Sequence, residues 1–75
     1  MITDKTLAAQ LSKLLLEISG QLDASVAEVQ EKCSDVELRS YRLGCGKVMA
    51  EIYLELLRPL YKTHPALKPV ELEID

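Results

Sequence analysis

The feature that most constrains the fold is the helical spacing of the apolar residues between Leu7 and Cys33. Most of them stand three or four positions apart, the separation that repeats on one side of an α-helix. This stripe contains Leu7, Leu11, Leu14, Leu15, Ile18, Leu22, Val26, Val29 and Cys33. Either Thr3 or Asp4 can cap the start, because each side-chain oxygen can accept a hydrogen bond from a free backbone N–H. The sequence therefore predicts one long helix over about residues 4–33.

The pair Ser19-Gly20 interrupts the helix propensity of this segment. Glycine costs about 1 kcal/mol relative to alanine inside a helix. The apolar stripe nevertheless stays in phase on both sides of the pair, so we expect a bend at most. The alternative is a real break, because the segment from Ser25 to Glu28 matches a capping box, the motif that commonly starts a helix.

A second helix is predicted to start at another capping box, Ser34-Asp35-Val36-Glu37, where the first stripe ends. The apolar residues that follow again have helical spacing. They are Leu38, Tyr41, Cys45, Val48, Ile52 and Leu56. Pro59 has no N–H to donate, so this helix, over about residues 35–58, should end near Leu57 or kink there. The following letters, PLYKTH, are expected to add a turn or two.

Two long helices joined by a tight turn make an antiparallel hairpin, so the predicted fold class is all-α. Each helix has roughly 25 to 30 residues and a length of about 40 Å. Residues 64–75 contain two prolines and end in acidic residues, which indicates an extended C-terminal arm after a hairpin of residues 1–63. The chain is thus predicted to be a single helical domain.

A lone hairpin covers only part of each stripe, and 75 residues bury a modest fraction of their surface. The two cysteines give no disulfide framework, and without Phe or Trp the core must be mainly aliphatic. We therefore expect a second copy to pack against the hairpin and form a four-helix dimer. The alternative is a three-helix monomer in which the chain folds back at Gly20 or at Gly44-Gly46.

The overall charge argues against several classes of function. The net charge is −3 and the pI is about 5.1, whereas a general attraction to nucleic acid or anionic membranes needs a positive surface. Asp4, Lys13 and Glu17 interrupt the first apolar residues, unlike a secretory signal. No apolar run approaches the roughly 18 residues of a membrane span. With free-looking cysteines as well, a cytoplasmic protein is expected.

The segment Tyr41–Met49, YRLGCGKVM, contains the Gly-Lys pair of a phosphate-binding loop. Such a loop also needs a glycine five residues before the pair and a Ser or Thr after the lysine, and these positions hold Tyr41 and Val48. The helix here instead carries four small residues, Gly44, Cys45, Gly46 and Ala50. Small residues let another backbone approach closely. We interpret the segment as a packing site for the other helix, a second copy or a partner.

Arg39, Arg42 and Lys47 form a local group of basic residues beside Tyr41. Arginine suits bidentate capture of carboxylates, so an acidic protein partner is one candidate ligand. The alternative is a small regulator that contacts nucleic acid through these three cations, with steep salt dependence as its signature. The predicted set for partner binding or helix packing is Arg39, Tyr41, Arg42, Gly44, Cys45, Gly46 and Val48.

No residues in the sequence suggest a catalytic, cofactor or metal site. Cys33 and Cys45 form no CxxC pair and His64 is the only further soft ligand, so we expect buried or half-buried thiols. His64 has no nucleophile or orienting acid nearby in sequence, which favours a role at a helix end. The arm offers further apolar residues that could dock in a groove, namely Leu67, Val70, Leu72 and Ile74.

These patterns together predict a non-enzymatic, cytoplasmic helical interaction or adaptor protein. It is expected to act through self-association, as a homodimer, or by binding a protein partner. No cofactor, metal ion or small-molecule substrate is expected, and neither is a membrane association. The nucleic-acid regulator described above is the alternative.

Overall fold

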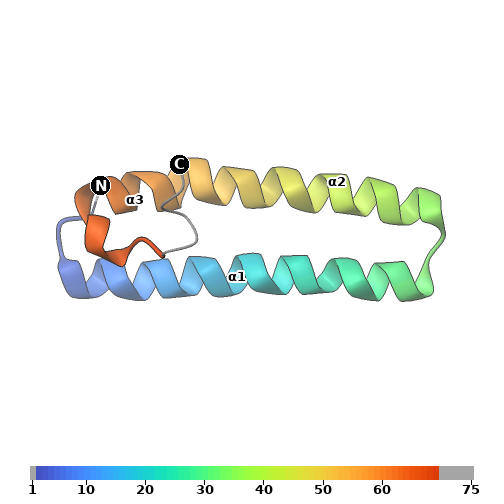
Figure 1. Ribbon diagram of the computed structural model, residues 1–75, viewed down its shortest axis with the longest axis horizontal. Coiled ribbons are helices and arrows are strands. Elements are labelled where there is room, and N and C mark those ends of the chain that lie inside the picture. The colour runs from blue at the N-terminus through green and yellow to red at the C-terminus, as the bar shows by residue number, and fades with distance from the viewer. Residues whose placement is uncertain (1, 70–75) are drawn as a thin grey trace.

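The chain folds into two antiparallel helical segments joined by a short turn, which confirms the predicted all-α hairpin (Figure 1). A computed structural model describes residues 2–69, and these contain no strand. The elements in chain order are α1 (Lys5–Lys32), α2 (Asp35–Glu51), a π-helical turn η1 (Ile52–Leu57), α3 (Arg58–Thr63) and a 3₁₀ turn η2 (Pro65–Leu67). The molecule is elongated, with extents of 45 × 21 × 20 Å.

Helix α1 starts where the sequence predicts and is unbroken through Gly20. The carboxylate of Asp4 caps the start by accepting a hydrogen bond from the N–H of Leu7 at 2.9 Å. The alternative break with a capping box at Ser25 is wrong. The Ser25 hydroxyl instead donates to the carbonyl of Leu22 at 2.6 Å, inside the continuous helix.

The turn between α1 and α2 is fixed by the predicted capping box. The Ser34 hydroxyl oxygen accepts from the N–H of Glu37 at 3.3 Å, and the Glu37 carboxylate accepts from the N–H of Ser34 at 2.9 Å. That carboxylate also accepts from the Ser34 hydroxyl at 2.9 Å. The backbone hydrogen bond from Ser34, with a smaller contribution from its hydroxyl, lowers the pKa of Glu37.

The two cysteines differ in exposure. Cys33 is the residue that caps the C-terminal end of α1, and it is exposed, so the expectation that both thiols are buried or half-buried is wrong for this residue. The physical reason is that α1 stops at Lys32, which leaves Cys33 in the turn and off the helix face that contacts α2. Cys45 is buried, as predicted.

Helix α2 runs unbroken through Gly44 and Gly46, as α1 does through Gly20. The three-helix alternative required the chain to fold back at one of these places, and it is therefore wrong. Helix propensity alone disfavours these glycines, but each has an ordinary helical backbone with no positive φ.

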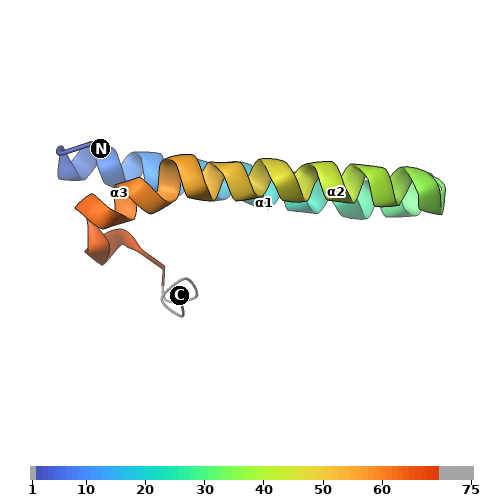
Figure 2. The same ribbon diagram turned by 90° about the horizontal axis from the view of Figure 1, so that it is seen from above.

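The returning helix continues past Pro59 with a widened turn directly before it. Pro59 cannot donate an N–H, and in a regular α-helix its ring would clash with the carbonyl four residues earlier. In η1 the N–H of Arg58 instead bonds to the carbonyl of Tyr53, five residues earlier. The predicted helix end near Leu57 or residue 58 is thus wrong, because helical structure extends to Thr63. The alternative, a kink, agrees with the bend at α3 in Figure 2.

The buried core lies at the end of the hairpin where α1 begins and α3 stops, here called the α3 end. Among the described residues, the buried side chains are Ala8, Ser12, Cys45, Leu57, Leu60 and Tyr61. All but Cys45 are at the α3 end. The widened turn η1 supplies Leu57 to this core, and α3 supplies Leu60 and Tyr61.

The beginning of the described chain is hydrogen-bonded to the residue that ends α3. Nε2 of His64 lies 2.6 Å from the carbonyl oxygen of Ile2. A carbonyl only accepts, so the imidazole donates from Nε2 and holds a proton there. The backbone N–H of His64 bonds to the carbonyl of Leu60, which confirms the predicted position at a helix end.

Candidate partner-binding surfaces

The residues predicted for partner binding are divided between two faces of α2. One recess, of about 510 Å³, is formed by α2 residues alone: Arg39, Arg42, Leu43, Gly46, Lys47 and Ala50. A groove of about 410 Å³ between the two helices is lined by Leu22, Ser40, Tyr41, Gly44, Cys45 and Val48. The structure therefore does not bring the predicted set together into one site.

Some of the side chains that line the groove between the helices already contact other residues of the same chain. The hydroxyl of Tyr41 lies 2.7 Å from that of Ser25. Because the Ser25 hydroxyl donates to a backbone carbonyl, Tyr41 is the donor in this pair. Cys45 is 7% exposed, whereas Val48 is 50% exposed. Tyr41 and Cys45 thus join α2 to α1, and Val48 remains on the surface.

Gly44 and Gly46 do not mark a close approach of the two helices. Apart from the adjoining residues and the backbone of its own helix, a Cβ atom placed on either residue would meet no atom within 4 Å. The interpretation that these small residues let α1 approach α2 closely is therefore wrong. Approach by a second copy or by a partner stays a prediction.

The basic residues Arg39, Arg42 and Lys47 line their recess together with apolar residues. Leu43 is 61% exposed, and Ala50 lies about two helical turns further along α2. Cations beside an exposed leucine suit an apolar side chain flanked by carboxylates better than they suit a uniformly charged phosphate backbone. The nucleic-acid alternative through these residues stays a prediction.

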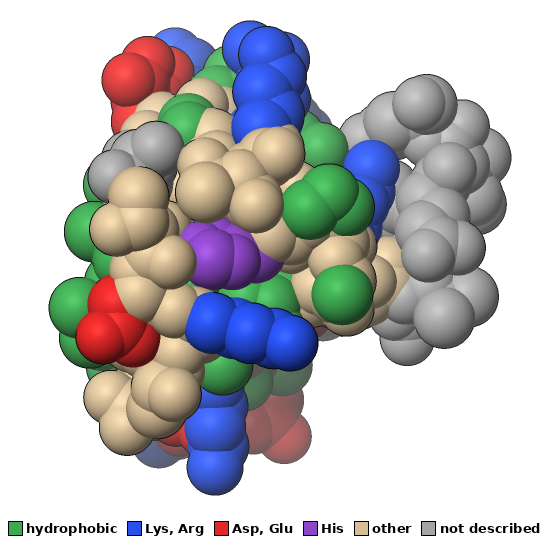
Figure 3. Space-filling model, turned by 90° about the vertical axis from the view of Figure 1, so that its left-hand side faces the viewer, with side chains coloured by type: hydrophobic (Ala, Val, Ile, Leu, Met, Phe, Trp, Pro, Cys, Tyr) green, Lys and Arg blue, Asp and Glu red, His purple; other side chains and the backbone are tan. Residues whose placement is uncertain are grey.

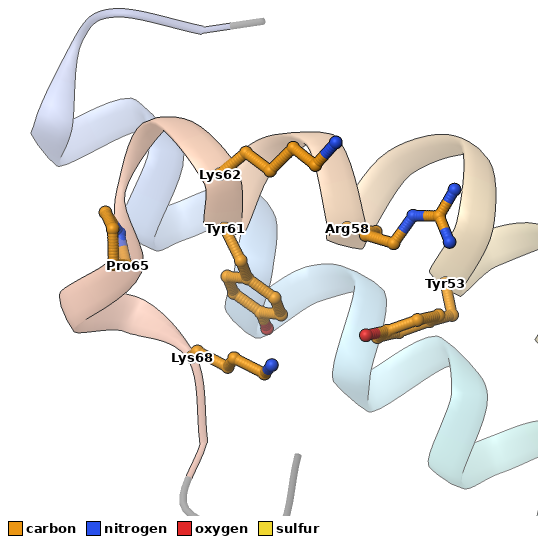
Figure 4. A pocket seen from close by; sticks show the side chains of 6 residues that line it. All are labelled: Tyr53, Arg58, Tyr61, Lys62, Pro65 and Lys68. Atoms are coloured by element: carbon orange, nitrogen blue, oxygen red, sulfur yellow. The ribbon is translucent and has the colours of Figure 1, made fainter. Parts of the chain in front are cut away.

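A second cationic group, which the sequence analysis missed, surrounds a recess at the α3 end. This recess has a volume of about 510 Å³ and is lined by Tyr53, Arg58, Tyr61, Lys62, Pro65 and Lys68 (Figure 4). Its cations come from α3 and from the residue after η2, which the fold brings together. The sequence did contain a signal, because residues 58–69 include Arg58, Lys62, His64 and Lys68 but no Asp or Glu.

An apolar face also extends along the first half of α1. Its members Leu7, Leu14 and Ile18 are 43%, 49% and 37% exposed. They stand beside a separate inner stripe of buried and half-buried residues that contacts the returning helix, namely Ala8, Ser12, Leu15, Ser19, Leu22, Val26 and Val29. The single stripe predicted from the sequence is therefore two neighbouring stripes.

A groove of about 300 Å³ with a wholly aliphatic lining adjoins this face. It is formed by Ile2, Leu11, Leu15, Leu56 and Leu60. Leu56 is 41% exposed, although the sequence predicts it on the inner side of the second helix. The widened turn η1 changes the helix phase at this point, so Leu57 takes the buried position and Leu56 faces the groove.

The apolar residues of the predicted arm are only partly described. Leu67 is half-buried at the end of η2, while Val70, Leu72 and Ile74 lie outside the described residues. Within residues 2–69, no three His, Cys, Asp or Glu side chains are placed to share a metal ion. No helix in the same range combines the length and apolar character needed to cross a bilayer.

The fold and its surfaces define a small helical hairpin with two cationic recesses and one apolar face. Compared with protein-family models, curated proteins and solved structures, the chain matches none. The surfaces therefore have to be interpreted from their own geometry.

Proposed function

We propose that this chain is a small, non-enzymatic, cytoplasmic helical interaction protein that acts by self-association, with two hairpins forming a four-helix bundle. The observation that supports the proposal is the imbalance between buried and exposed apolar side chains. Within the described residues, five hydrophobic residues are buried, whereas ten large ones are exposed. A hairpin with this imbalance has apolar surface left for another helical pair.

The apolar face, together with the half-buried Leu11 and the exposed Leu56 of the adjoining groove, has the geometry that such an interface requires. The four α1 residues, Leu7, Leu11, Leu14 and Ile18, are separated by four, three and four positions, the spacing of a helix seam in coiled coils and bundles. Fully burying an exposed leucine contributes about 1.5–3 kcal/mol. Leu7, Leu14, Ile18 and Leu56 are 37–49% exposed, so two copies have about 5–10 kcal/mol still to gain, which is comparable with the roughly 4–15 kcal/mol that association costs.

The aliphatic groove beside this face supports a symmetric dimer, in which the same surface of two copies forms the interface. In a two-fold symmetric dimer the same patch on both copies is used, so each copy must offer both protruding and receiving groups. Leu14 and Ile18 protrude, and the groove around Leu11 and Leu56 is a place for the partner's side chains. One continuous patch thus supplies both halves of the interface.

Light scattering coupled to size-exclusion chromatography tests the proposal. We expect a dimer for the unchanged chain and a monomer for Leu14→Asp, because a charge at the centre of the interface is desolvated without a partner. Leu16→Asp is the matched control, since Leu16 is 38% exposed but lies about 200° around the helix from Leu14. A monomeric unchanged chain, or a dimer that only the control variant dissociates, would contradict this interface. Far-UV circular dichroism checks that both variants are folded.

The alternative function, contact with nucleic acid, is supported by one observation, namely that Arg39, Arg42 and Lys47 line the same recess. Binding of a labelled oligonucleotide at low salt would favour it, with affinity falling steeply as salt is added. On the proposed function we expect no binding, because the chain is acidic overall.

A further inference from the structure

The cationic recess at the α3 end is a second candidate binding site, separate from the apolar face. Arg58 and Lys62 project from α3, and Lys68 projects from the segment after η2 (Figure 4). The rings of Tyr53, Tyr61 and Pro65 complete the lining. Three cations from two segments therefore surround a partly apolar hollow.

The surroundings of this recess are rich in positive charge. Figure 3 looks directly at the α3 end and shows the histidine near its middle, with Lys and Arg side chains above, to the right and below it and with Asp or Glu side chains toward the left of the view. No acidic residue occurs between positions 58 and 69. The recess thus concentrates positive charge in a chain whose net charge is −3.

Hydrogen bonds fix both walls of the recess. The hydroxyl of Tyr61 is 2.7 Å from that of Ser12 on α1, and this pair is buried. On the other side, the bond from His64 to the Ile2 carbonyl anchors the residue directly before η2. The two walls are therefore held in place before a ligand arrives, which lowers the ordering cost of binding.

We propose that this recess binds an acidic peptide segment in which carboxylates alternate with apolar side chains. Arginine and lysine attract the carboxylates, while the half-buried ring of Tyr53 and the exposed ring of Pro65 offer contact area to the apolar side chains of the peptide. In an extended strand, alternate side chains point to opposite sides, so the carboxylates of such a peptide all lie on one face and can approach the cations of the recess together.

The chain's own C-terminal letters, VELEID, have this alternating pattern, with Glu71, Glu73 and Asp75 between apolar residues. Residues 70–75 lie outside the described range, and only their sequence enters here. A peptide with these letters is therefore a probe of the proposed class. The proposal is independent of the dimer, because no member of the apolar face lines this recess.

Fluorescence anisotropy of a labelled VELEID peptide, titrated with the full chain at low salt, tests the proposal. We expect saturable binding that weakens at least about tenfold in the double variant R58A/K62A. The matched control is K13A/K32A, which removes two exposed cations of α1 that line neither cationic recess and should change the affinity less than about twofold. Arg58 and Lys62 are exposed, so the double variant should keep the helical circular dichroism of the unchanged chain.

Two further measurements separate carboxylate-peptide recognition from simpler explanations. The neutral peptide VQLQIN should bind at least about tenfold more weakly than VELEID. The variant E71Q/E73Q/D75N replaces the carboxylates of the chain's own VELEID letters and should bind the probe at least as tightly as the unchanged chain. Equal binding by R58A/K62A, equal binding of the neutral peptide, or full displacement by millimolar inorganic phosphate would each overturn the proposal.

Discussion

The two ends of the hairpin contain the same hydrogen-bonded pair in different surroundings. At the α3 end, Ser12 and Tyr61 are joined at 2.7 Å, and the pair is buried. Nearer the turn, Ser25 and Tyr41 are joined at the same distance, but this pair is exposed. The hydrogen-bond geometry alone therefore does not decide how much each pair stabilises the fold. The surrounding packing does, because a buried polar group left without a partner costs far more than one that water can reach.

The largest expected effect tests whether the α3 end holds most of the core. Leu60→Ala removes a side chain that is 1% exposed, and we expect a loss of about 2–5 kcal/mol in the free energy of unfolding. Leu38→Ala, at a half-buried position near the turn, should cost clearly less. Urea unfolding followed by circular dichroism measures both. Equal losses would mean that the two ends contribute alike.

The Tyr–Ser pairs allow a direct test of the comparison. Tyr61→Phe leaves the buried Ser12 hydroxyl without a partner and should cost about 1–3 kcal/mol. Tyr41→Phe should change the unfolding free energy by less than about 0.5 kcal/mol, because water replaces the lost bond.

Thermal unfolding of these two variants, with Ser12→Ala combined with Tyr61→Phe as a control, measures the difference. The double variant should recover part of the loss, since it removes both polar groups. A larger loss for Tyr41→Phe than for Tyr61→Phe would reverse the comparison.

The smallest expected effect concerns the turn and its dependence on pH. The pKa of Glu37 is lower in the folded chain than its ordinary value of 4.5, because its carboxylate accepts hydrogen bonds from Ser34. A lowered pKa in the folded state means that the stabilisation is present above the ordinary value and is lost as pH falls through the folded value. We expect Glu37→Gln to flatten the acid side of the stability curve slightly, measured as the thermal midpoint at successive pH values. Identical acid slopes for the two proteins would contradict this.

The sequence predicts the parts of the fold that depend on local hydrogen bonds. The cap hydrogen bonds of Asp4, Ser34 and Glu37 each join residues three positions apart, so these caps can be predicted from the sequence alone. The path of the chain around Pro59 does not follow from the sequence alone. A helix end, a kink and a widened turn are all compatible with a residue that has no backbone N–H to donate. Packing of Leu60 and its neighbours on α1 decides between them, and that contact joins distant parts of the chain.

The candidate surfaces were predictable to a lesser degree. The separation of Arg42 from Tyr41 onto different faces follows from helical phase, since adjacent residues point about 100° apart. The cationic recess depends on η2 returning beside α3, which no local pattern indicates. The division of the α1 stripe is likewise tertiary, because Leu14 and Leu15 are equally apolar and only the position of the second helix distinguishes them.

The position of the core also has a consequence for the order of folding. The buried hydrogen bond between Ser12 and Tyr61 spans 49 positions, whereas the pair nearer the turn spans 16. Closing the longer loop costs more chain entropy before any side chain is buried. A hairpin that forms progressively from its turn therefore gains little stabilisation from burial at first. Most side chains become buried only when the start of α1 and α3 come together. This arrangement favours all-or-none folding over stepwise growth from the turn.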